Sequence, residues 1–130
     1  MPYLIDGNNL MGTMKGMRMD DPEARRRLLR FLLGIPLLRT QGIALVFDGP
    51  PEAAPVGPEG SGRMLERASV RFSGAGITAD DAIVGILARA SPEHYLLVTS
   101  DRELQMRAQA LGVRVQDCRE FLREIEHGQP

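Results

Sequence analysis

Short apolar runs alternate with longer amphipathic segments along the chain, and this pattern predicts strands separated by helices. The runs are apolar at nearly consecutive positions, as in strands that are buried on both faces of a parallel sheet. Turn-forming residues, mainly Gly, Pro, Asp and Ser, follow most of them. The predicted strands are residues 3–6, 43–47, 68–72, 95–99 and 113–115.

The segments between these strands carry signals for helix starts. Residues 20–22 are two aspartates before a proline, which predicts an aspartate-capped helix that runs to about Leu33, where Gly34 and Pro36 end or bend it. Later helices are expected to begin at Thr78, Ser100 and Asp117, and the last two to end near Leu111 and Glu126.

This alternation predicts an α/β fold with a doubly wound, mainly parallel sheet of about five strands and helices on both faces. The 130 residues are expected to form a single domain, 1–130. Residues 11–19, rich in Gly and Met, and residues 50–62, rich in Pro and Gly, are predicted loops. The second loop could cover a substrate or be a plain connector.

Charge and cysteine content narrow the function classes. The formal net charge is −1, so any nucleic-acid contact must be local. Lys15 is the only lysine, and guanidinium groups suit phosphate oxygens. Arg26 and Arg30 belong to an arginine-rich helix face that is either solvated or a phosphate-binding stripe. The single cysteine, Cys118, excludes an internal disulfide and predicts a reducing, cytoplasmic location.

No membrane or secretion signal is expected in this sequence. The first residues lead directly into a strand, without the charged and apolar regions of a signal peptide. The longest apolar stretch, Leu28 to Leu38, is interrupted and too short to cross a bilayer. We therefore expect no membrane partner.

Aspartates follow four of the predicted strands: Asp6, Asp48, Asp80 and Asp101. Doubly wound folds place their sites at the carboxyl ends of the strands, so these acids are expected at one edge of the sheet. Carboxylates that cluster without thiolate or histidine favour Mg²⁺ or Mn²⁺, whose activated water can hydrolyse a phosphodiester. Either Asn8 or Asn9, and either Thr99 or Ser100, could hydrogen-bond a metal water or a phosphate.

Local roles compete with this site for several of the same acids. Thr78 and Asp81 have the spacing of a capping box, and so do Ser100 and Glu103. Asp101 could then be a simple first-turn acid that the helix dipole favours, and Asp48 could serve only a turn. Asp6 has no such local explanation.

Other enzyme classes fit the residues poorly. Thr13 stands where a P-loop needs lysine, and a phospho-receiver domain needs a lysine after a late strand, whereas Lys15 comes early. Cys118 is expected at a helix start, far from the acids, so thiol catalysis is excluded.

Four motifs together resemble the NYN domain, specifically its YacP-like branch within the PIN-like nuclease superfamily. They are Leu4-Ile-Asp-Gly-Asn-Asn9, Val46-Phe-Asp-Gly49, Phe72-Ser-Gly-Ala-Gly-Ile-Thr-Ala-Asp-Asp81 and Val98-Thr-Ser-Asp101. The resemblance implies a ribonuclease that uses one or two Mg²⁺ or Mn²⁺ ions bound by Asp6, Asp80 and Asp101, with Asp48 as a further member and Asn9 as the motif asparagine.

Two features depart from the pattern of this branch. The segment after Asp48 is shorter than usual, and the helical glutamate of many PIN domains has no clear counterpart, although Glu52 and Glu66 are near in sequence.

The hypothesis from the sequence is thus a divalent-metal-dependent endoribonuclease. Asn9 and Ser100 would orient water or phosphate, and Arg63, Arg26 or Arg30 would hold the RNA backbone. The alternative is a PIN-like module that binds RNA or a protein without cutting. A homodimer is possible, but periodicity alone does not show one.

Overall fold

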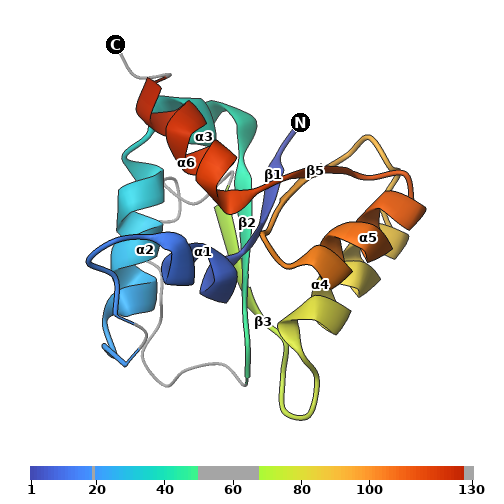
Figure 1. Cartoon of the computed structure of the whole chain (residues 1–130), viewed down its shortest axis with the longest axis horizontal. Coiled ribbons are helices and arrows are strands. Elements are labelled where there is room, and N and C mark those ends of the chain that lie inside the picture. The colour runs from blue at the N-terminus through green and yellow to red at the C-terminus, as the bar shows by residue number, and fades with distance from the viewer. Residues whose placement is uncertain (19, 50–67, 128–130) are drawn as a thin grey trace.

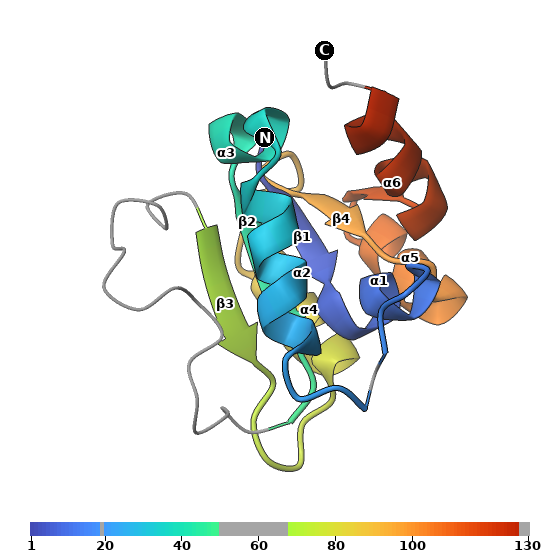
Figure 2. The ribbon, with the colours of Figure 1, turned by 90° about the vertical axis from the view of Figure 1, so that its left-hand side faces the viewer.

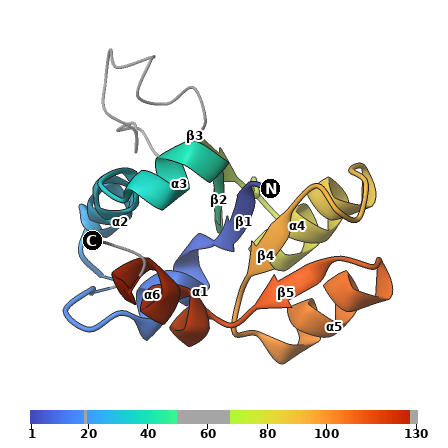
Figure 3. The same ribbon diagram turned by 90° about the horizontal axis from the view of Figure 1, so that it is seen from above.

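The strands form one parallel sheet in the computed structural model, which describes residues 1–18, 20–49 and 68–127. They are β1 (Tyr3–Asp6), β2 (Ile43–Phe47), β3 (Ala68–Phe72), β4 (Leu96–Val98) and β5 (Arg114–Gln116). The order is β3-β2-β1-β4-β5 (Figure 3), and every neighbouring pair is parallel. The predicted parallel sheet is confirmed, with shifts of one residue at the ends of β4 and β5.

Helices cover both faces of this sheet, as predicted. They are α1 (Gly7–Thr13), α2 (Ala24–Leu33), α3 (Pro36–Gln41), α4 (Ala79–Ala88), α5 (Arg102–Ala110) and α6 (Cys118–His127). Helices α1, α2, α3 and α6 lie on one face, and α4 and α5 lie on the other (Figures 1 and 3). None of the helices in the described ranges has the length and apolar character needed to span a bilayer.

Alternating side chains of the central strands enter two separate cores. Ile5 and Phe47 pack in the core beneath α1, α2, α3 and α6, whereas Leu4, Val46 and Leu97 pack in the core beneath α4 and α5. All five side chains are fully buried. Because both faces of the central strands are covered, β2 and β4 are apolar at every position, which explains the unbroken apolar runs in the sequence.

Two helices were absent from the sequence prediction. Helix α1 begins directly after Asp6, and it occupies residues partly assigned to a loop. Its first residues, Gly7, Asn8 and Asn9, are poor helix formers, but Leu10 is fully buried in the core and anchors the helix there. Helix α3 follows the predicted break and has Pro36 at its first position, where proline is tolerated.

Capping follows the sequence signals only in part. Thr78 caps α4, as predicted, because its Oγ1 accepts a hydrogen bond from the Asp81 amide at 3.1 Å. Asp117 accepts from the Arg119 amide at 2.8 Å immediately before α6. The aspartate cap predicted for α2 is wrong, because Glu23 occupies the N-cap position without a side-chain bond and Asp21 accepts from the Glu23 amide ahead of the helix.

The predicted capping pair at the start of α5 is also wrong. Asp101 is the N-cap of this helix, and its side chain accepts from the Leu104 amide. Ser100 cannot serve the helix because its Oγ accepts a hydrogen bond from the Cys118 amide at 3.1 Å. A tertiary contact thus replaces the local capping pattern. The predicted loop 50–62 lies outside the described residues.

Candidate functional site

The carboxyl ends of the parallel strands meet at one edge of the sheet, toward which the arrowheads in Figure 2 point. The strand order reverses direction between β1 and β4, and doubly wound folds place binding sites at this position. Asp6 ends β1, Asp48 follows β2, Asp80 lies in the first turn of the helix after β3, and Asp101 follows β4. Each of the four predicted acids therefore comes from a different strand connection.

Asp6 is the most buried of these acids, with 5% of its surface exposed. Thr99 Oγ1 donates to its Oδ2 at 3.1 Å, and the Asn9 amide donates to its Oδ1 at 3.5 Å. Burial raises the pKa of Asp6 to about 6, the two hydrogen bonds oppose this shift, and the charges of Asp80 and Asp48 add to it. A carboxylate held in this way is costly to ionise unless a cation accompanies it.

Asp80 is half-buried and lies in the electric field of the other acids. Burial is the main cause that raises its pKa, followed by the charges of Asp101 and Asp48, while Arg107 opposes the shift. Asp80 thus interacts with all three other predicted acids, since its charge also acts on Asp6. The structure brings the four carboxyl groups close enough to repel one another.

Three of the four carboxylates also accept backbone hydrogen bonds at helix starts. Asp6 is the N-cap of α1 and Asp101 that of α5, and Asp48 Oδ1 accepts from the amide of Ala79, the first residue of α4, at 2.7 Å. Helix N-termini carry partial positive charge, which offsets part of the repulsion among the acids. Three helices therefore begin at this edge.

The chemistry of these donors suits Mg²⁺ or Mn²⁺, because they are hard oxygen ligands from carboxylates. As they stand, however, no three Asp, Glu, His or Cys side chains within the described ranges form a ready metal-binding group. The described site is therefore a set of neighbouring acids that repel one another, and not an assembled coordination shell.

Thr99 links the two acids that border the position where the strand order reverses. It is fully buried, donates to Asp6, and accepts from the Asp101 amide at 3.1 Å through the same Oγ1. The sequence left open whether Thr99 or Ser100 takes part, and the structure places the Thr99 hydroxyl between the acids. The signal for Thr99 in the sequence was its position at the end of a predicted strand, two residues before Asp101.

Asn9 and Ser100 are engaged in bonds that join distant segments. Asn9 Oδ1 accepts from the Ser100 amide at 2.7 Å and from the Cys118 thiol at 3.2 Å. Cys118 thus lies beside the turn after β1, and the expectation that it is far from the acids is wrong. Burial raises the pKa of its thiol to about 11, with Asp6 and Asp117 contributing, so the thiol stays protonated.

Arg25 is a neighbour of the site that sequence reasoning missed. Its guanidinium group donates to the carbonyl oxygen of Asp48 at 3.0 Å and lies 4.9 Å from the ring centroid of Phe47 and 5.5 Å from that of Phe72. Three and four residues after Arg25 come two buried leucines of α2, and this spacing was the signal that the residue faces the protein.

The predicted phosphate contacts are distributed differently. Arg26, in the first turn of α2, forms an ion pair with Glu23 at 3.7 Å. Arg30 is exposed in the last turn of the same helix, away from its start. Arg63 lies outside the described residues, as do Glu52 and Glu66.

A cavity of about 160 Å³ has Asn8 and Arg25 in its lining. Both residues contact the backbone of Asp48: Asn8 Oδ1 accepts from the Asp48 amide at 3.1 Å, and Arg25 donates to the Asp48 carbonyl oxygen.

Comparisons with known proteins agree with this architecture. Residues 3–129 match the family model described as the YacP-like NYN domain. A crystal structure of a mutant of Rae1 (YacP) from Bacillus subtilis is similar with a TM-score of 0.73 and 25% identity, over 98% of this chain and 76% of that one. A second structure of Rae1 gives 0.68 and 23%, over 98% and 74%, which shows the shared fold alone. No curated protein sequence matches the chain.

Proposed function

The chain belongs to the YacP-like NYN domain family, and from this premise we propose that it is a divalent-metal-dependent endoribonuclease that hydrolyses RNA phosphodiester bonds at the strand-end acids. The observation that carries the proposal is the grouping of Asp6, Asp48, Asp80 and Asp101 at the strand ends, where burial first and the charges of neighbouring acids second raise the pKa of Asp6 and Asp80. Acids that a fold gathers against their own repulsion usually serve a functional site.

Asp6, Asp80 and Asp101 are the proposed ligands for one or two Mg²⁺ or Mn²⁺ ions, with Asp48 assisting directly or through water. When bound, such an ion stabilises charge on the phosphate and lowers the pKa of an attacking water. Asp6 is buried and Asp80 and Asp101 are partly buried, which strengthens their electrostatic interactions relative to those of fully exposed carboxylates, whereas Asp48 is exposed.

Thr99, Asn9 and Ser100 are proposed to position the acids. Thr99 holds Asp6 and the turn at Asp101 together, and Asn9 fixes that turn through the Ser100 amide. The side-chain oxygens of Asn9 and Ser100 already accept hydrogen bonds from the protein. Their proposed effect on a water or phosphate is therefore exerted through the acids that they position.

Arg25 and Arg26 are the proposed contacts for the RNA backbone near the acids. They lie in the first turn of α2, and Arg25 reaches Asp48. The guanidinium of Arg25 is held in place by its contacts with two aromatic rings, and guanidinium groups suit phosphate oxygens. Arg30 and Arg63, the other candidates from the sequence, remain proposed contacts for the RNA backbone.

Incubation with end-labelled RNA and DNA, in Mn²⁺, in Mg²⁺ and in EDTA, tests this function. We expect internal cleavage of RNA with Mn²⁺ or Mg²⁺, no cleavage in EDTA, and recovery when Mn²⁺ is added in excess. Asp80→Asn is expected to lower the rate at least 100-fold. Glu120→Gln removes the same charge from the exposed surface of α6 and should cut at the parent rate.

The non-cleaving binding module is favoured by one observation, that the described residues contain no ready group of three metal ligands. The same incubation separates the two functions. RNA that is retained by the protein but stays at full length with every metal would contradict the nuclease and support the binding module.

A further inference from the structure

A second cavity lies on the opposite face of the sheet from Arg25. It has a volume of about 340 Å³ and is bordered by β3, the C-terminal part of α4 and the segment before β4. Arg71, Arg89, His94 and Tyr95 contribute its charged and aromatic lining, and no described lining residue is a carboxylate. We call this cavity the α4 groove. Its composition is that of a site for an anion.

The two arginines reach the α4 groove from different elements. Ala68, Val70 and Phe72 of β3 pack toward α2, so the alternate residue Arg71 projects toward α4. The guanidinium of Arg89 lies back over Gly85, 3.8 Å from the position that a side-chain carbon there would occupy. The guanidinium of Arg89 is thus within van der Waals reach of position 85, one turn back along the helix.

Neither arginine has an acidic partner within the described residues. In the described part of the chain, Arg71 and Arg89 form no ion pair, whereas Arg18, Arg27 and Arg107 do. The chain has 17 acidic residues against 16 basic ones, so two cations without acidic partners in one cavity are a departure from its average charge. Guanidinium forks bind phosphate oxygens in bidentate fashion, which makes phosphate the matching anion.

Aromatic rings border the same groove. His94 is exposed and packs edge-on against Tyr95, with ring centroids 4.4 Å apart. Proteins that bind single-stranded RNA combine cationic side chains for the backbone with such rings for stacking bases. The pairing of arginines with a ring thus fits a nucleotide strand better than an acidic peptide.

Helix α4 connects the α4 groove to the acids. Asp80 lies in its first turn and Arg89 is its C-cap, nine residues later. At about 1.5 Å per residue, the two positions are roughly 14 Å apart along the helix. A strand of RNA that lies beside α4 would need only a few nucleotides to reach from one to the other.

We propose that the α4 groove binds backbone phosphates of single-stranded RNA a few nucleotides from the bond that lies at the acids. The inference rests on the proposed function, because it takes RNA as the substrate. It assigns to Arg71 and Arg89 a contact with RNA outside the acidic site, and to His94 and Tyr95 the stacking of an adjacent base.

Fluorescence anisotropy in EDTA tests the α4 groove without requiring cleavage. The variant is Arg71→Gln with Arg89→Gln, and the control is Arg39→Gln with Arg123→Gln, which removes the same charge from exposed positions of α3 and α6. For a labelled RNA of twelve nucleotides, we expect the groove variant to bind about tenfold more weakly than the control. The binding constant should also depend less on salt in the groove variant. The slope of log K against log salt concentration is expected to be smaller in magnitude by about 1.4 than in the control, since two phosphate contacts are lost at about 0.7 each.

RNA length gives an internal comparison in the same experiment. A dinucleotide bound at the acids is too short to reach the α4 groove, roughly 14 Å away along α4, so its affinity should be equal in the two double variants. Arg71→Lys with Arg89→Lys keeps both charges but removes the forks, and it should fall between the parent and the glutamine variant. Circular dichroism is expected to show the parent fold, because both arginines are exposed.

Equal affinities of the groove variant and the control for the longer RNA would overturn the inference, and so would a parent protein that binds no RNA. Failure of the proposed function is a different result. A parent that binds RNA through the groove but cuts none leaves the groove established and the nuclease contradicted. A parent that cuts RNA while the groove variant binds like the control contradicts the groove alone.

Discussion

At the scale of single residues, the carboxyl group of Asp6 combines burial with membership of a group of four acids. Its exposed fraction is 5%, its pKa is raised to about 6, and its hydrogen bonds come from Thr99 and Asn9. In the metal-free protein above pH 6, the ionised group lies in a place that disfavours charge. The buried charge therefore costs the fold free energy at this position, and a bound cation would reduce that cost.

Asp6→Asn is expected to abolish RNA cleavage and to stabilise the metal-free protein at pH 8. The folded-state pKa of Asp6, about 6, exceeds the ordinary value of 3.8. The contribution of Asp6 to the stability of the parent is therefore fully present below pH 4 and is lost as the pH rises through 6. A shift of about two units corresponds to at most about 3 kcal/mol. Asparagine keeps an acceptor for the Asn9 amide, so we expect a gain of about 1–3 kcal/mol at pH 8.

Urea unfolding in EDTA at pH 4 and pH 8 measures this effect. The gain of the variant should be present at pH 8 and vanish at pH 4, where Asp6 of the parent is protonated. A variant that is no more stable than the parent at pH 8 would show that the Asp6 charge costs the fold nothing.

At the scale of elements, α1 begins directly after Asp6 and packs closely against the end of β2 at the sheet edge. A side-chain carbon built on Gly7 would lie 2.4 Å from the ring of Phe47, which is fully buried. Glycine directly after Asp6 therefore lets the helix begin against the ring. The same helix contains Gly12, where an added carbon would meet nothing within 4 Å.

Gly7→Ala and Gly12→Ala form a matched pair that tests this contact. Gly7→Ala should destabilise the protein by about 1–3 kcal/mol, because the core must shift to accept the methyl group. Gly12→Ala should be neutral or stabilise by up to about 1 kcal/mol, since alanine is the better helix former. Thermal unfolding of both variants is the measurement, and equal effects would contradict the packing of α1 on Phe47.

Local patterns in the sequence predicted the sheet but missed some elements. Apolar runs are set by burial on both faces and could be recognised directly, as could the Thr78 cap. Helix α1 could not, because Gly7, Asn8 and Asn9 are poor helix formers that depend on the Asp6 cap and on core packing. The N-cap role of Asp101 at the start of α5 was missed because Ser100 instead accepts a hydrogen bond from the amide of Cys118, 18 residues away in the sequence.

In the candidate site, too, some features could be predicted from the sequence and others depend on contacts between distant residues. The order of the strands implied that four aspartates share an edge, and their mutual effect on pKa values agrees with that proximity. The contacts of Asp48 with Ala79 and of Asn9 with Cys118 span 31 and 109 residues, and no local pattern encodes them. Metal binding by these acids stays a prediction.

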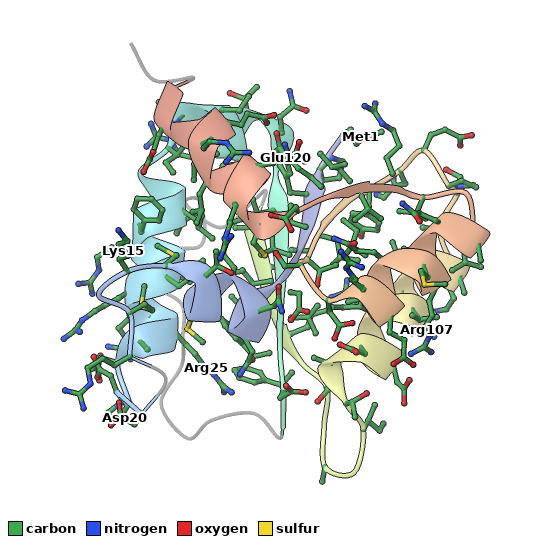
Figure 4. The ribbon with its side chains drawn as sticks, in the orientation of Figure 1. Met1, Lys15, Asp20, Arg25, Arg107 and Glu120 are labelled. Carbon is green, nitrogen blue, oxygen red and sulfur yellow. The ribbon has the colours of Figure 1, made fainter. Side chains whose placement is uncertain are left out.

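At the scale of the whole molecule, charge is arranged so that cations flank an acidic edge. Arg25 projects from α2 on one side of the sheet and Arg107 from α5 on the other (Figure 4). Arg107 forms an ion pair with Asp81 at 3.0 Å and opposes the rise in the pKa of Asp80. Within a chain of net charge −1, this arrangement can attract a polyanion locally, next to the acids that are the proposed ligands of a divalent cation.

The affinity for Mn²⁺, measured by calorimetry on the parent and on three single variants, tests the central claim most directly. The account predicts that Asp6→Asn, Asp80→Asn and Asp101→Asn each bind Mn²⁺ at least tenfold more weakly, because each removes a ligand charge from a shared centre. Glu120→Gln, which removes an exposed acid from α6, should bind like the parent. Parent-like affinity in all three aspartate variants would contradict a metal centre at the strand ends.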